Sequence, residues 1–109
     1  NPPDGVQYGA YGAWGYDIES DTPGGLDFME VKGRIEGGDT FTLTRQEVVT
    51  ALNKGDRSVL ALVRVHLDDR VSVRYVRRPL TEPIPAGVTA MQFDWDHMWN
   101  RGIDMETPV

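Results

Sequence analysis

The sequence predicts one domain of the mixed α/β (α+β) class, whose mixed β-sheet contains an antiparallel hairpin meander, one crossover helix and further strands. Its 109 residues, of which 39% are hydrophobic and 26% charged, suit a single globular core. Short alternating runs within residues 16–43, separated by turns rich in Gly and Asp, predict strands. A helical pattern at 44–54 then precedes a Val- and Leu-rich run at 58–65, which predicts a helical crossover to a buried strand.

The first part of the chain is predicted to be a glycine-rich loop followed by strands. Residues 1–15 carry aromatic side chains between regularly spaced glycines. No Lys-Ser/Thr pair and no helix pattern follow, so we do not expect a phosphate-binding loop. The turn "SDTPGG" joins the first two strands into an antiparallel hairpin, and a second turn leads to the third strand. The predicted strands are residues 16–19, 26–32 and 40–43.

The helix at 44–54 begins with a capping box. The Thr44 hydroxyl can accept from the Glu47 N–H, while the Glu47 carboxylate reaches back to the Thr44 N–H. Val48, Val49 and Leu52 follow at helical spacing and form one apolar face. Glu47 is therefore assigned a structural role in the helix cap.

The second part of the chain is predicted to form two more strands and a tail. Residues 58–65 are nearly continuously apolar, as in a strand covered on both faces, and 71–76 alternate after a turn. In the tail, Trp95, His97 and Trp99 would share a face if extended, where they could pin the tail down or stack on unpaired bases. The predicted organisation is a loop at 1–15, an α/β core at 15–78, and a tail at 79–109 that packs on the core or on a partner.

Composition excludes several classes of function. The chain has no cysteine and two histidines, which rules out disulfides and a structural zinc cage. The longest apolar run is too short to cross a membrane, and no signal sequence opens the chain, so a cytoplasmic location is expected. No Ser/His/Asp or Cys/His nucleophile motif is visible. Because the chain begins without methionine, we expect it to be a domain of a longer protein.

The stretch "FMEVKGR" places an acid and an ammonium two residues apart on one strand. Glu30 and Lys32 share a strand face, and Asp17 on the preceding strand would join them in a suitable hairpin register. Mg²⁺ binds carboxylates, and the Val31 carbonyl could supply another oxygen. The lysine could orient a metal-bound water or stabilise charge on a phosphate, so the residue types fit phosphodiester hydrolysis. The alternative is a solvated Glu–Lys pair of little energetic value.

Residues 15–65 resemble a known family of domains. The resemblance rests on the order and spacing of several motifs, and it is to the domain at the C-terminus of the protein NO VEIN, also found attached to helicase-like bacterial proteins. That family looks like a branch of the restriction-endonuclease-like, or PD-(D/E)xK, nuclease superfamily. The matching strings are Gly15-Tyr16-Asp17-Ile18, Glu30-Val31-Lys32-Gly33, Phe41-Thr42-Leu43-Thr44 with Glu47, and Gly55-Asp56.

The resemblance implies a site residue by residue. Asp17 and Glu30 would be ligands of Mg²⁺ or Mn²⁺, and Lys32 the catalytic lysine. Such sites often include a polar residue on the following helix, and because Glu47 is explained by the cap, Gln46 is the candidate. The chain departs from the family pattern in one respect, since no helix precedes the Asp17 strand.

Nucleic acid is the expected partner, although the net charge of −6 argues against phosphate binding by the whole surface. Arg64 and Arg74 are predicted to project from one face of the last hairpin, with the valines of that hairpin facing inward. Such charges also occur on edge strands simply to prevent aggregation. The candidate nucleic-acid-binding residues are Arg34, Arg45, Arg64 and Arg74.

Two functions from different classes follow from the sequence. The first is a metal-dependent nuclease-like domain acting on DNA rather than RNA, within a larger helicase-like or DNA-processing protein. The alternative is a non-catalytic module that docks nucleic acid or protein on a degenerate nuclease-like fold. Other domains of the parent chain and a second copy of this chain are further expected partners, and a membrane is not.

Overall fold

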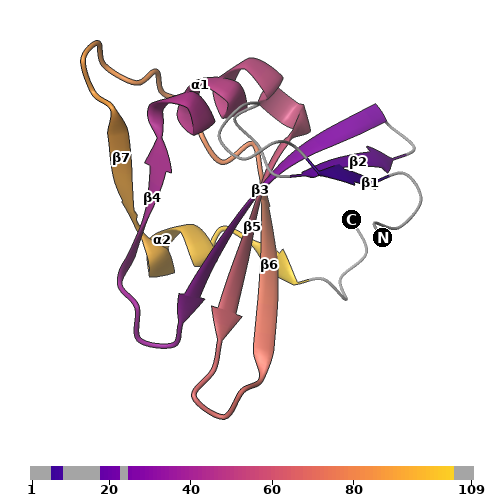
Figure 1. Ribbon diagram of the computed structural model, residues 1–109, viewed down its shortest axis with the longest axis vertical. Helices are drawn as coiled ribbons and strands as arrows, with labels where there is room; N and C mark the ends of the chain where they lie inside the picture. The colour runs from indigo at the N-terminus through magenta and orange to yellow at the C-terminus, as the bar shows by residue number, and fades with distance from the viewer. Residues whose placement is uncertain (1–5, 9–17, 23–24, 105–109) are drawn as a thin grey trace.

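The computed structural model describes residues 6–8, 18–22 and 25–104 (Figure 1). Within these ranges eight strands, two α-helices and one short 3₁₀ turn follow one another along the chain. The elements are β1 (Val6–Tyr8), β2 (Ile18–Thr22), β3 (Gly25–Ile35), β4 (Thr40–Thr44), α1 (Arg45–Lys54), η1 (Gly55–Arg57), β5 (Ser58–Val65), β6 (Val71–Arg77), β7 (Ala90–Asp94), α2 (Trp95–Trp99) and β8 (Ile103–Asp104).

The main sheet is mixed, as the sequence predicts. Its strand order is β1-β2-β3-β5-β6-β8, and β3 and β5 are parallel whereas the other neighbours are antiparallel. Two parallel neighbours need a crossover, and α1 lies on that connection. The mixed sheet, the β2–β3 hairpin and the crossover helix are therefore confirmed.

Two predicted features of the first part of the chain are wrong. β1 lies within the predicted loop, because Val6–Tyr8 pairs with β2 at the edge of the sheet. β4 does not continue the meander from β3. It pairs instead with β7 in a separate two-stranded sheet, where Phe41 stacks on Phe93 with ring centroids 5.4 Å apart. The apolar side chains of β4 thus find their partners near the end of the chain rather than on β3.

The capping box of α1 is confirmed. Thr44 Oγ1 accepts from the Glu47 N–H at 3.2 Å, and Glu47 Oε1 accepts from the Thr44 N–H at 2.9 Å. The helix ends at Lys54 because Gly55 adopts a positive φ of 54°.

One core lies between the main sheet, the β4–β7 pair and the two helices (Figure 1). Leu60 and Leu62 of β5 pack there with Val48 of α1. Residues 79–104 also contribute, through Ile84 and α2. The buried hydrophobic residues of this cluster are Phe41, Leu43, Val48, Leu60, Leu62, Val76, Ile84, Trp95, Met98 and Trp99.

The aromatic residues of the tail are helical rather than extended. Asp94 caps α2 by accepting from the His97 N–H at 2.7 Å. Trp95 and Trp99 are therefore four residues apart on one helical face, where both are buried, and His97 is exposed. Trp95, His97 and Trp99 therefore do not share one face, as they would in an extended chain. In the part of the chain that the structure describes, no helix has the length and apolar character needed to cross a membrane.

Candidate functional site

Lys32 lies between two carboxylates that come from different elements. Its Nζ is 3.6 Å from Glu30 Oε2 on β3 and 3.2 Å from Glu47 Oε1 on α1. The side chains of Glu30, Lys32 and Glu47 are 14%, 24% and 17% exposed, so solvent reaches the group without surrounding it. The prediction that Glu30 and Lys32 share one face is confirmed, and Glu47 completes a triad with them.

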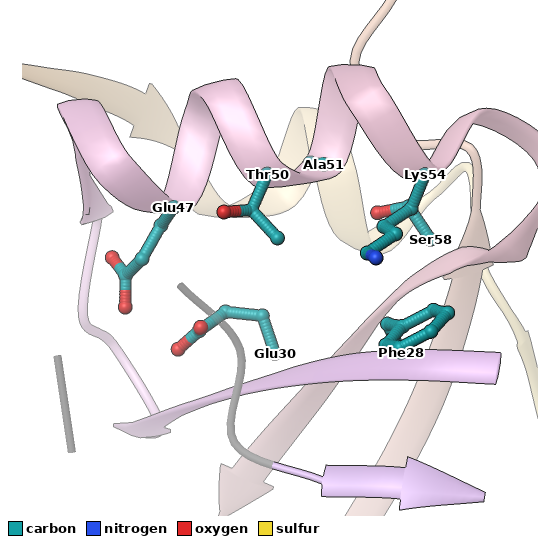
Figure 2. A pocket seen from close by; sticks show the side chains of 7 residues that line it. All are labelled: Phe28, Glu30, Glu47, Thr50, Ala51, Lys54 and Ser58. Atoms are coloured by element: carbon teal, nitrogen blue, oxygen red, sulfur yellow. The ribbon is translucent and has the colours of Figure 1, made fainter. Parts of the chain in front are cut away.

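The crossover explains why these residues meet. Glu30 pairs with Leu60 and Lys32 with Leu62, so both polar side chains leave the sheet on the face that α1 covers. The capping box orients the first turn of α1, and the same Glu47 Oε1 accepts from the Thr44 N–H and contacts Lys32. Figure 2 shows the carboxylates of Glu30 and Glu47 directed toward one another below the helix.

The pKa of Glu47 is lowered from its ordinary value. Burial acts in the opposite direction, but the Thr44 N–H, the side-chain hydrogen bond with Glu30 and the Lys32 ammonium together outweigh it. Two carboxylates thus face one ammonium, and a cation could balance the remaining negative charge.

A shallow hollow opens beside the triad (Figure 2). Glu30 and Glu47 lie at one end, and Lys54 Nζ lies at the other, 4.1 Å from the centre of the Phe28 ring. The hollow encloses far less space than the ~300 Å³ or more of pockets that hold a small molecule, so a ligand would lie across the rim rather than inside. The lining residues are Phe28, Glu30, Glu47, Thr50, Ala51, Lys54 and Ser58.

The other predicted site residues are placed only in part. Asp17 lies outside the described residues, and its role stays a prediction. Val31 pairs with Ala61 between the two site residues of β3, and its carbonyl as a ligand also stays a prediction. Gln46 is exposed on α1, whereas its neighbour Glu47 contacts Lys32. The contact of Glu47 with Lys32 was not predicted, because the capping box already explained Glu47 and Lys32 lies fifteen positions away.

The two carboxylates are of the kind that binds Mg²⁺, since hard oxygen donors suit this ion. Within residues 6–8, 18–22 and 25–104, no three side chains of His, Asp or Glu are grouped so that they could hold a metal. The donor chemistry fits a divalent cation, and a third carboxylate would have to come from outside those ranges.

The predicted arginine strip faces the core rather than solvent. Arg64 and Arg74 do share one sheet face, because Arg64 pairs with Ser72 and Arg74 with Leu62. That face carries Leu62 and meets α2, and the guanidinium carbons of both arginines lie over the Trp99 ring, at 4.4 and 4.9 Å from its centre. Val63, Val65, Val71 and Val73 occupy the opposite face, so the faces predicted to point inward and outward are exchanged.

Each of the four candidate arginines binds another part of the fold. Arg34 Nε donates to the Thr40 carbonyl, and Arg45 donates to the carbonyls of Pro85 and Val88. Arg64 is 2.9 Å from Asp96, and Arg74 is 3.1 Å from Asp104. All four guanidiniums thus hold local structure, and their role in binding nucleic acid stays a prediction.

A second charged cluster, which the sequence does not indicate, lies on the opposite face of β3. Asp27 is 3% exposed, and Arg77 donates to both of its carboxylate oxygens at 2.9 Å. Arg57 approaches the same carboxylate at 3.5 Å. The hydrogen bonds from Arg77 lower the pKa of Asp27 more than burial raises it. This cluster has more positive than negative groups, and the buried acid is well satisfied.

Comparison with known proteins identifies a family. No curated protein and no solved structure matches the chain. One family model, described as "Protein NO VEIN, C-terminal", matches residues 6–76, which is more than half of the chain. The matched region contains the Glu30–Lys32–Glu47 triad and the crossover that assembles it. The chain belongs to the family of NO VEIN C-terminal domains.

Proposed function

We propose that this domain is a metal-dependent nuclease-like domain that hydrolyses DNA phosphodiesters within a larger helicase-like or DNA-processing protein. The observation that carries the proposal is the position of Lys32 between Glu30 and Glu47 on the β3–α1–β5 crossover. An acid and a lysine two residues apart on a central strand, with a polar residue on the next helix, match the PD-(D/E)xK pattern. A restriction-endonuclease-like core is part of this proposal.

Three carboxylates would hold Mg²⁺ or Mn²⁺ in the proposed site: Glu30, Glu47 and Asp17. Asp17 precedes Ile18, and Ile18 pairs with Met29 next to Glu30, so the proposal requires the hairpin register to continue by one residue. When bound, the metal would polarise the phosphate and make a coordinated water more acidic.

The side chains of the triad would act directly on the substrate. Lys32 can donate a hydrogen bond to a phosphate oxygen or to the attacking water, and its charge stabilises the negative charge that develops in the transition state. Glu47, whose pKa is lowered, remains ionised as a ligand or acceptor at neutral pH. Lys54, at the far end of the hollow, would contact a neighbouring phosphate along the rim.

A nicking assay with supercoiled DNA in Mg²⁺ or Mn²⁺ tests the proposal. We expect metal-dependent cleavage that falls by at least about 100-fold in Glu30→Gln and in Lys32→Met, since each removes a charged group from the reacting centre. Glu47→Gln is the sharpest variant, because glutamine preserves the capping box but removes the charge. Glu82→Gln, at an exposed position outside the triad, is the matched control.

Equal cleavage by the wild type and Lys32→Met, or cleavage that persists without metal, would remove the proposal. The same assay with Asp17→Ala tests the predicted third ligand. Single-stranded DNA and RNA substrates tested in parallel decide the predicted preference for DNA.

The second candidate is a non-catalytic docking module, and the arginine contacts favour it. Arg34, Arg45, Arg64 and Arg74 all hold internal structure, and the net charge is −6, which leaves little surface suited to a DNA backbone. Calorimetric titration with Mn²⁺ separates the two candidates. A nuclease site gives heat that Glu30→Gln abolishes, whereas a docking module gives none. Other domains of the parent chain, a homodimer and a cytoplasmic location stay predictions under both candidates.

A further inference from the structure

The lower ends of β3, β5 and β6 in Figure 1 carry a third polar cluster, separate from those of Lys32 and Asp27. His66 Nδ1 is 2.8 Å from Glu36 Oε1, and His66 Nε2 is 2.8 Å from Ser72 Oγ. Glu36 follows β3, His66 follows β5, and Ser72 is the second residue of β6. Three neighbouring strands thus contribute an acid, an imidazole and a hydroxyl that form one continuous chain of hydrogen bonds.

With a neutral imidazole, the chemistry of the groups sets the direction of these hydrogen bonds. An ionised carboxylate can only accept, so Nδ1 carries the hydrogen that His66 donates to Glu36. The Nε2 atom of a neutral imidazole is then an acceptor, and the Ser72 hydroxyl donates to it. This order, with an acid that orients an imidazole and an imidazole that accepts from a serine, is the arrangement that activates a serine nucleophile.

The main chain holds the cluster in place. The Glu36 N–H donates to the Val65 carbonyl at 2.7 Å, which joins the end of β3 to the end of β5. The turn between β5 and β6 is closed by His66, whose N–H donates to Arg70 and whose carbonyl accepts from Asp69. The imidazole side chain is 19% exposed, so its orientation is constrained while solvent still reaches it.

The arginines next to Ser72 are engaged elsewhere in the fold. Arg64 is the direct cross-strand partner of Ser72, and Arg34 pairs with Arg64 on the other side, so the three residues share one sheet face. The Arg64 guanidinium binds Asp96 at 2.9 Å and lies over the Trp99 ring, and Arg34 donates to the Thr40 carbonyl. The proposal therefore rests on the hydrogen-bonded chain of Glu36, His66 and Ser72.

We propose that Glu36, His66 and Ser72 form a serine-nucleophile site that hydrolyses acyl esters without a metal. Ser72 Oγ forms a bond to the carbonyl carbon as its proton passes to His66 Nε2. The bond to the leaving alcohol then breaks, and the alcohol takes that proton. Water attacks the acyl-serine, gives one proton to His66 and releases the acid, and the proton returns to Ser72. Glu36 acts as a positioning residue.

The site is independent of the proposed nuclease function. Glu36 lies four residues beyond Lys32, which is ~13 Å along an extended strand. Activity at Ser72 should therefore survive chelation of metals and the substitution Lys32→Met. Failure of one proposal leaves the other unaffected.

A fluorophosphonate probe tests the serine directly, because it forms a stable bond to an activated hydroxyl and releases fluoride. We expect peptide mapping to place the adduct on Ser72, with Ser20 and Ser58 unlabelled in the same sample. Labelling should be lost in Ser72→Ala and fall by at least about 100-fold in His66→Gln, the contribution of a general base. His97→Gln replaces an exposed histidine outside the cluster and should label like the wild type.

Two further measurements separate catalysis from a structural role. Glu36→Gln should slow labelling while Glu36→Asp restores part of it, because aspartate keeps the acceptor charge. Hydrolysis of p-nitrophenyl acetate in the presence of a chelator should follow the same order of variants. Labelling of wild-type Ser72 no faster than Ser20, or unchanged labelling in a folded His66→Gln, would show that the hydrogen bonds only tie the strands together and would overturn the proposal.

Discussion

The two charged clusters of β3 lie three residues apart on opposite faces and are built in opposite ways. On one face a single buried acid, Asp27, is held by the guanidiniums of Arg77 and Arg57. On the other face a single ammonium, Lys32, lies between the carboxylates of Glu30 and Glu47. The first cluster joins β3 to β6 and to the 3₁₀ turn η1, and the second joins the sheet to the crossover helix.

The difference shows how charge balance separates a structural cluster from a candidate site. Asp27 is almost completely buried, and hydrogen bonds occupy both of its oxygens. Removing such a group lowers the stability of the fold substantially. Its two oxygens already have hydrogen-bond partners, so it is poorly suited to bind a ligand. The two acids around Lys32 exceed the one ammonium. This excess of negative charge could bind a cation.

The largest expected effect is on stability, at Asp27. Asp27→Ala should lower the free energy of unfolding by about 2–3 kcal/mol, because it leaves two guanidiniums facing a buried space. Their partial exposure keeps the loss below that for a fully buried pair. Urea denaturation at pH 7 measures it, with Glu30→Gln as the matched variant on the other face, expected to change stability by less than ~1 kcal/mol. Equal losses in the two variants would contradict the distinction between the clusters.

The pH dependence of stability sharpens the same contrast. Asp27 has a pKa below its ordinary value of 3.8, so its contribution to stability is complete above pH 3.8 and disappears as the pH falls through the lowered folded-state pKa. The difference in unfolding free energy between the wild type and Asp27→Ala should therefore be constant near neutral pH and shrink in strong acid. Denaturation curves from pH 7 to pH 2 provide the test, and a difference that does not shrink would show that lost packing, not charge, causes the loss.

The smallest expected effect separates the two roles of Glu47. Thr44→Ala should cost about 1 kcal/mol, because it removes the cap acceptor of α1. Glu47→Gln should cost about 0.5 kcal/mol or less, since glutamine can still accept from the Thr44 N–H. Thermal unfolding measures both variants, and Mn²⁺ calorimetry should show loss of binding only for Glu47→Gln. Loss of binding in both would mean that the cap, and not the Glu47 charge, maintains the site.

Local signals predicted the strands and the helix between β2 and β6, but not β1, β7, α2 or β8. The capping box of α1 and the strands at β5 and β6 depend on residues within about ten positions of one another, so the pattern carries the information. Glu30 and Lys32 share a face for the same reason, because they are two residues apart on one strand. The β2–β3 hairpin and the parallel crossover also followed from element order and turn length.

The partners of these residues could not be predicted, because they are distant in the chain. Glu47 reaches Lys32 across fifteen positions, Glu36 reaches His66 across thirty, and Arg77 reaches Asp27 across fifty. β4 likewise pairs with β7 because the tail brings an apolar strand and two tryptophans to it. The prediction exchanged the two faces of the last hairpin. Alternation along a strand shows which side chains share a face, but it does not show which face packs against the helices.

The sequence by itself determined the local periods, the helix cap and the placement of an acid and a lysine on one face of β3. These depend on backbone geometry and on hydrogen bonds between near neighbours. Only the tertiary structure decided that Glu47 faces Lys32, that Asp27 is buried between arginines, and that His66 links Glu36 to Ser72. The physical reason is that packing a single core fixes which strand faces are covered, and through-space charge neighbours follow from that packing rather than from spacing along the chain.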